Sequence, residues 1–129
     1  MNLIDAKEFH ERKAKLYRLY GRQLPYYLSI PHGWLGTVEE MFAMLEMSIK
    51  PSSFRKMWFV ELVKKGKNAK FYWIPRDKIN RSDDCRAFEI VRSYAYIASC
   101  KCEICGMPGK EIVTDGCHSI LCSVHSHVS

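Results

Sequence analysis

The residues with the clearest chemistry lie in the last quarter of the chain. Two residues separate Cys102 from Cys105, and Cys122 and His125 repeat that spacing after sixteen further residues. Each pair can chelate one ion, because a tight turn or the first turn of a helix brings residues i and i+3 to the same side. Three thiolates and one imidazole complete a tetrahedral zinc site with no position left for water. The pattern predicts a structural zinc ion, with Gly106 supplying a left-handed backbone to the knuckle.

Other uses of the cysteines stay open at this stage. Disulfides, or free thiols without a metal, are also compatible with six cysteines. Cys100 or Cys117 could replace an assigned ligand, His118 is left over, and His127 could replace His125 only with a different geometry. If Cys122 lies on a helical turn, the module is a treble-clef-like finger. Zinc would then compensate for a shortage of large apolar side chains.

Length and composition describe the protein that carries this module. The 129 residues are 47% hydrophobic, which is enough for one folded domain with a core. We divide it into a helical and β-hairpin core, residues 1–99, and a zinc-finger module, residues 100–129. No apolar run reaches the length of a membrane span, and the N-terminus is not built like a secretion signal. We expect no membrane association and a reducing cytoplasm, where paired cysteines more often hold metal than form disulfides.

A first helix is expected over residues 5–20. Phe9, Leu16 and Tyr20 fall on one face of it, and Asp5 can cap its start. The helix should end at Gly21.

A second helix is expected to begin at Thr37 and to end before Pro51. Thr37 and Glu40 have the spacing of a capping box, in which each side chain accepts from the other's backbone amide. Trp34 should pack back over the first turns. The apolar stripe and the methionines expected to join it in the core are Val38, Phe42, Leu45 and Ile49, with Met41, Met44 and Met47.

Residues 57–74 change to the alternating pattern of strands, interrupted by the turn of residues 64–68. This predicts a β-hairpin with a basic tip. We expect Trp58, Phe71 and Trp73 to pack under the helices, although aromatic residues beside lysines could also form a platform for stacking bases.

A third helix is expected from residues 82–84, whose oxygens suit an N-cap, to about Ser99. Ala87, Val91, Tyr94 and Ala98 share one face of it. We interpret Cys85 as a small buried hydrophobe. The predicted fold class is therefore α+β, a small single domain of helices packed on a β-hairpin with a C-terminal treble-clef-like zinc finger.

The net charge of +6 points to an acidic partner. Residues 7–22 contain six basic side chains and residues 50–81 contain ten, against two carboxylates in each stretch. A solvated face is the alternative for any single charge. The candidate contacts to a partner or nucleic acid are Arg12, Lys15 and Arg18 on the first helix and Lys64, Lys65, Lys67 and Lys70 on the hairpin.

We expect no enzymatic activity. Zinc-bearing nucleases need further histidines beside the finger to activate water, and no His-His or acid-His pair has a working spacing here. A Walker loop, a nucleophile elbow and a nucleotide-binding glycine run are also absent from the sequence.

Several of these motifs together resemble a family of small, mostly uncharacterised proteins of bacteriophages and prophages. The resemblance runs from about residue 33 to residue 125, and the zinc block is its specific part. Family members have a Gly-Trp-Leu run where this chain has Gly116-Cys117-His118. The matching segments are Gly33-Trp34, Lys70-Phe71-Tyr72-Trp73, the run from Cys102 to Gly109, and Leu121-Cys122-Ser123-Val124-His125. The resemblance implies a phage context inside a bacterial host cell.

Two functional hypotheses follow. The first is an inhibitor or adaptor that acts on a host protein or protein–nucleic-acid complex, including one of host defence. The second is direct binding of DNA or RNA through the basic hairpin and the N-terminal helix. Nuclease-sensitive, strongly salt-dependent binding would distinguish the second from the first.

Overall fold

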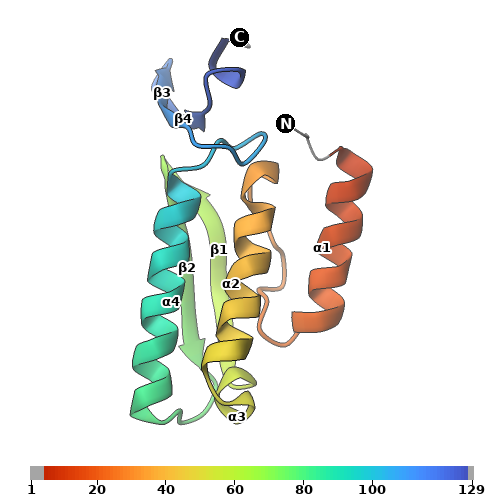
Figure 1. Ribbon diagram of the computed structural model, residues 1–129, viewed down its shortest axis with the longest axis vertical. Coiled ribbons are helices and arrows are strands. Elements are labelled where there is room, and N and C mark those ends of the chain that lie inside the picture. Colours follow the sequence, from red (N-terminus) through yellow and green to blue (C-terminus); the bar gives the residue numbers. More distant parts are fainter. Residues whose placement is uncertain (1–4, 128–129) are drawn as a thin grey trace.

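The computed structural model describes residues 5–127. Three long helices lie in a row, with α2 and α4 in front of one β-hairpin and α1 beside α2, and a smaller hairpin forms the C-terminal module (Figure 1). This confirms the α+β class. The elements are α1 (Ala6–Tyr20), η1 (His32–Trp34), α2 (Leu35–Ser48), α3 (Pro51–Phe54), β1 (Met57–Lys65), β2 (Asn68–Pro75), α4 (Arg81–Ser99), β3 (Lys110–Thr114), β4 (Cys117–Leu121) and η2 (His125–His127).

Helix α1 forms as its sequence predicts. The Asp5 carboxylate accepts a hydrogen bond from the Glu8 backbone N–H at 2.7 Å, which satisfies one of the free donors of the first turn. Phe9, Leu16 and Tyr20 are buried.

The expected start of the second helix is wrong. Helix α2 begins at Leu35, and Trp34 at its N-cap position already has helical backbone angles, because η1 leads directly into the helix. Thr37 therefore lies inside α2, fully buried, and its hydroxyl has no hydrogen-bond partner within residues 5–127. Glu40 is exposed to solvent. The Thr37–Glu40 capping box does not form.

Helix α2 places the predicted apolar stripe in the core. Val38, Phe42 and Leu45 are fully buried and Ile49 nearly so, and Met41 joins them. Met44 and Met47 are exposed, against expectation. They lie three residues apart on the outer face of the helix, whereas the core-facing stripe uses the opposite face.

The hairpin of β1 and β2 is confirmed, with a turn shorter than predicted. Lys65 pairs with Asn68, so the loop has two residues, and Gly66 takes a positive φ of 61°. A parallel bridge between Ser29 and Val63 covers part of the outer edge of β1. Strand β2 pairs only with β1 in the part of the chain that the structure describes.

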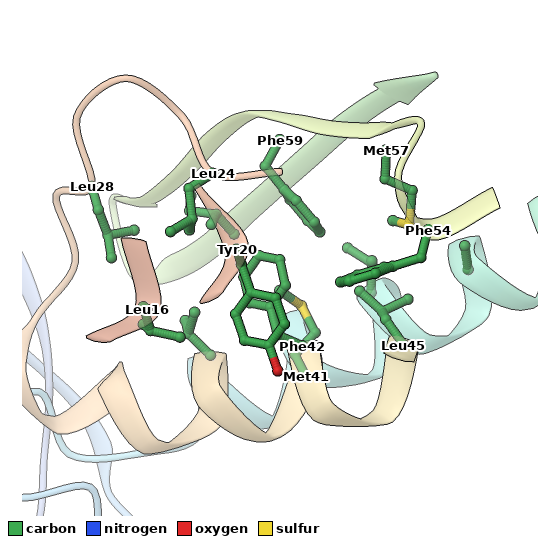
Figure 2. Close-up of a cluster of buried hydrophobic side chains, with 14 of the residues drawn as sticks. Leu16, Tyr20, Leu24, Leu28, Met41, Phe42, Leu45, Phe54, Met57 and Phe59 are labelled. Carbon is green, nitrogen blue, oxygen red and sulfur yellow. The ribbon is translucent and has the colours of Figure 1, made fainter. Parts of the chain in front are cut away.

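Aromatic side chains from four segments meet in the core (Figure 2). Phe42 of α2 stacks on Tyr20 with ring centroids 4.8 Å apart, and it meets the edge of Phe59 from β1 at 5.2 Å. Phe71 and Trp73 pack against this cluster from β2, as predicted. Trp58, also expected to pack under the helices, is only partly buried and lies outside this cluster.

Helix α4 begins at Arg81, and its N-cap is Asn80, two residues before Ser82, whose side chain accepts from the Asp83 N–H at 2.8 Å. Ala87 and Val91 are buried in the predicted face. Cys85 is exposed, which corrects its interpretation as a buried residue. Helix α4 ends at Ser99, where the loop that carries the first two cysteines begins.

Candidate metal centre

The first ligand pair lies on a tight knuckle between α4 and β3. The Gly106 N–H donates to the Cys102 carbonyl at 2.9 Å, and the Cys102 N–H donates to the Met107 carbonyl at 2.7 Å. Gly106 has a φ of 80°, the left-handed conformation expected from the sequence. The knuckle thereby turns the Cys102 and Cys105 side chains to one side.

The second ligand pair follows the β3–β4 hairpin. This hairpin turns at Asp115 and Gly116, both with positive φ, and β4 leads to Cys122. The Ser126 N–H donates to the Cys122 carbonyl at 2.9 Å, and η2 starts at His125. This single turn brings Cys122 and His125 to the same side.

The four predicted ligands meet. The sulfur atoms of Cys102, Cys105 and Cys122 and a ring nitrogen of His125 all lie within 4.8 Å of one another. Cys105 Sγ lies 3.7 Å from Cys122 Sγ, and His125 Nδ1 lies 3.6 Å from Cys102 Sγ and 3.1 Å from Cys122 Sγ. His125 thus faces the sulfur atoms with Nδ1, and the cluster could hold a metal ion.

The backbone around the cluster favours thiolates at two of the three cysteines. Burial raises the pKa of Cys102, but backbone N–H groups that include that of Cys105 outweigh it and lower the pKa. The pKa of Cys122 is lowered chiefly by the His125 N–H. Burial and the neighbouring sulfurs raise the pKa of Cys105 to about 11. A cation in the cluster would offset the cost of ionising this third thiol.

The remaining cysteines do not join the cluster. Cys100 and Cys117 are exposed free thiols, as is Cys85, and no cysteine forms a disulfide. His118 Nδ1 instead lies 2.7 Å from a Glu111 carboxylate oxygen on the neighbouring strand. The structure therefore brings together the four predicted ligands, while Cys100, Cys117 and His118 lie outside the cluster. The side chain of His127, the remaining alternative, lies outside the described part of the structure.

The knuckle is joined to the core at the start of α2. The Gly33 N–H donates to the Glu103 carbonyl at 2.8 Å, and the Trp34 indole N–H donates to the Lys101 carbonyl at 3.0 Å. Trp34 is fully buried. Local sequence patterns predict that Trp34 packs over α2 but not this hydrogen bond, because its two partners lie 67 positions apart in the sequence.

A second joint connects the module to the hairpin tip through Glu103. One carboxylate oxygen lies 3.1 Å from Lys64 Nζ, and the other accepts from the Ile120 N–H at 2.6 Å. Lys64 Nζ also donates to the His118 carbonyl at 2.8 Å. Lys64 and Glu103 are three-quarters or more buried, so Lys64 is a structural residue of this joint.

The other predicted contact residues divide into paired and unpaired cations. Lys65 and Lys70 both lie near Glu61, and Lys67 lies 3.7 Å from Glu111. On α1, Arg12 forms a bidentate salt bridge with Glu39 of α2. Lys15 and Arg18 are exposed and have no ion pair among residues 5–127.

Comparison of the chain with protein-family models, curated proteins and solved structures gave no match. Within residues 5–127, none of the helices has both the length and the apolar character needed to span a bilayer.

Proposed function

We propose that the cluster holds a structural zinc ion. With zinc–sulfur bonds of about 2.3 Å and zinc–nitrogen bonds of about 2.0 Å, a tetrahedral site separates two sulfurs by about 3.8 Å and a sulfur from a nitrogen by about 3.5 Å. Two of the separations, 3.7 Å and 3.6 Å, are close to these values. Three sulfurs and one nitrogen also suit zinc better than magnesium or calcium, which prefer oxygen.

We further propose that the module is a treble-clef-like finger with no catalytic role. A knuckle, a β-hairpin and a final helical turn occur in the order that this fold uses. Four protein ligands leave no coordination site for a substrate. Outside the cluster, the ring of His32 is stacked on Phe9 with centroids 3.9 Å apart, which supports a packing role for this histidine.

The function that we propose for the whole protein is that of a non-catalytic adaptor or inhibitor that binds another protein. One observation carries this proposal: an apolar groove of about 640 Å³ lies between β2 and α4, beside the free edge of β2. Tyr72 of β2 and Phe88 of α4 line it, and more than half of each side chain is exposed.

The edge of β2 suits an extended peptide. A free strand edge offers backbone donors and acceptors to an added strand, and pockets beside it select the side chains of that strand. Near the hairpin tip, the Ala69 N–H already donates to Ser99 Oγ at 2.8 Å and is not available to an added strand. The added strand would therefore pair beyond Ala69, next to Tyr72 and Phe88.

The resemblance to phage proteins makes a bacterial host protein the expected partner, including one of a defence system. The experiment uses zinc-loaded protein mixed with nuclease-treated bacterial lysate, and native mass spectrometry of the captured complex. We expect a stoichiometric protein complex that persists at moderate salt and is lost in the double variant Tyr72→Ser/Phe88→Ser. Val113→Ser, which removes an equally exposed apolar side chain from β3, is the matched control. Equal binding by all three proteins would refute the groove as the binding site.

A further inference from the structure

Among residues 5–127, the largest group of lysines and arginines without an ion pair lies at the end of the protein opposite the Cys/His cluster (Figure 1). There α3 and the residues beside it, 50–56, meet the segment from the end of β2 into α4, residues 76–86. We call these two segments the basic end. They contain seven lysines and arginines and three aspartates.

Contacts between the two segments hold the basic end together. The Arg76 N–H donates to the Lys56 carbonyl at 2.8 Å, and Lys56 Nζ donates to the Lys78 carbonyl at 2.9 Å. Ser53 Oγ donates to the Asp83 carboxylate at 2.6 Å. The charges of the basic end are therefore presented by a defined surface and not by two independent loops.

None of the seven cations forms an ion pair with any residue that the structure describes. The hairpin tip differs, since each of its four lysines lies within 4 Å of a glutamate oxygen. The positive charge available to a partner is thus concentrated away from the predicted hairpin site.

Four of the seven cations surround one pocket of about 640 Å³. They are Lys50, Lys56, Lys78 and Arg81, and the exposed Ser52 and the Asp84 side chain also line it.

Asp83 lies behind this pocket, where its carboxylate is satisfied. It accepts from Ser53 Oγ, from Asn80 Nδ2 at 3.0 Å and from the Lys50 N–H at 3.3 Å. Asp84 is thus the one exposed carboxylate against four cations at the pocket, a charge balance suited to a multiply charged anion.

We propose that the basic end binds the phosphate groups of a nucleic-acid strand. Trp58 lies two residues after Lys56, which lines the pocket, and an aromatic ring there favours a nucleic acid over an acidic protein segment. Arg76 lies over the partly exposed Trp58 ring, 5.4 Å from its centroid, and these planar groups can stack with bases while the lysines contact phosphates. This inference is independent of the protein partner proposed for the groove beside β2.

The test is fluorescence anisotropy of a labelled single-stranded oligonucleotide with zinc-loaded protein over a series of salt concentrations. In the double variant Lys78→Gln/Arg81→Gln, we expect affinity to fall at least about tenfold. The slope of log Kd against log salt should decrease by roughly 1.4, or about 0.7 for each lost phosphate contact. Neither side chain donates a hydrogen bond within residues 5–127, so the fold should persist.

The matched control is Lys65→Gln/Lys67→Gln, which removes the same charge from the hairpin tip. It should change affinity less than about threefold, because both lysines already lie near glutamates. Unfolding curves and zinc content verify that each variant is folded. If Lys78→Gln/Arg81→Gln does not fold, the single variant Lys50→Gln takes its place. The proposal is overturned if wild-type protein does not bind the oligonucleotide at low salt or if both double variants weaken it equally. Tighter binding of a labelled polyglutamate peptide, lost in Lys78→Gln/Arg81→Gln, would also overturn it, in favour of an acidic protein partner.

Discussion

Gly33 of the core and Gly106 of the knuckle that carries Cys102 and Cys105 pack backbone against backbone. A Cβ atom on Gly33 would lie 2.6 Å from the Gly106 nitrogen and would overlap the Cys102 carbonyl oxygen. A Cβ on Gly106 would lie 2.6 Å from the Gly33 oxygen. Both neighbours are backbone atoms, which cannot rotate away as a side chain could. The C-terminal module therefore packs on the core at two positions where only glycine fits without displacing the neighbouring backbone.

The first prediction concerns this close approach. Gly33→Ala should lower the free energy of unfolding of zinc-loaded protein by about 1–3 kcal/mol, because the added methyl group must push the knuckle away. Denaturant titration measures the effect. Gly36→Ala is the control: the nearest heavy atom to its new Cβ is the Arg12 guanidinium at 3.8 Å, and alanine is favoured inside a helix. If Gly33→Ala is as stable as Gly36→Ala, the knuckle does not pack closely against Gly33.

The second prediction concerns Lys64. Lys64→Met should destabilise the protein by about 1–2 kcal/mol, because Glu103 is left as a largely buried carboxylate without its cation. Lys65→Met should change stability by less than about 0.5 kcal/mol, since Lys65 is more than half exposed and lies 3.9 Å from Glu61. Denaturant unfolding of both variants provides the comparison. Equal effects would mean that Lys64 is an ordinary surface lysine.

Local patterns were enough to predict the parts of the fold with short-range causes. The periodicity of Phe9, Leu16 and Tyr20 predicts the buried face of α1, and alternation with a glycine turn predicts the β1–β2 hairpin. The ligand set follows from chelate spacing, since Cys102 and Cys105 are brought together by a turn of a few residues. None of these inferences needs a distant contact.

The predictions that were wrong concern residues whose environment depends on distant contacts or on the side of a helix that they occupy. Thr37 does not cap α2 because η1 leads directly into the helix, which already begins at Leu35, two residues before Thr37. Residue type alone predicts a buried Cys85, but Cys85 lies two positions before the buried Ala87 and therefore on the opposite side of α4. Lys64 could not be assigned to the joint from sequence, because Glu103 lies 39 positions away and is brought near by the folding of the whole chain.

The third prediction separates metal ligands from bystander cysteines. Cys105→Ser should remove most bound zinc and lower the melting temperature, because a hydroxyl is a poor replacement for a thiolate in this set. Cys117→Ser should keep one zinc ion per chain, since Cys117 is exposed and outside the cluster. Native mass spectrometry with and without a chelator gives the stoichiometry. Full zinc content and an unchanged melting temperature in Cys105→Ser would exclude the proposed centre.

The fourth prediction concerns the Asp83 carboxylate, whose pKa is lowered chiefly by the Ser53 hydroxyl despite the opposing effect of burial, with help from Asn80. A group with a lowered pKa in the folded state stabilises the protein above its unfolded value, 3.8, and this contribution is lost as the pH falls through its folded value. Asp83→Asn should therefore be less stable than wild type above pH 3.8, and the difference should shrink at lower pH. Taking the difference between the two proteins removes the pH dependence of zinc binding. A pH-independent difference would assign the role of Asp83 to packing alone.

The fifth prediction links the metal to the core through Trp34. Chelation should loosen the knuckle and free the Lys101 carbonyl, so the buried indole loses its hydrogen bond and meets water. Tryptophan emission should shift to longer wavelength on chelation and return when zinc is restored. Trp34→Phe should abolish most of this shift, because Trp58 and Trp73 lie on the hairpin away from the knuckle. If emission of the wild-type protein stays constant while zinc leaves, the module and the core fold independently. The proposed role of zinc would then be limited to the module itself.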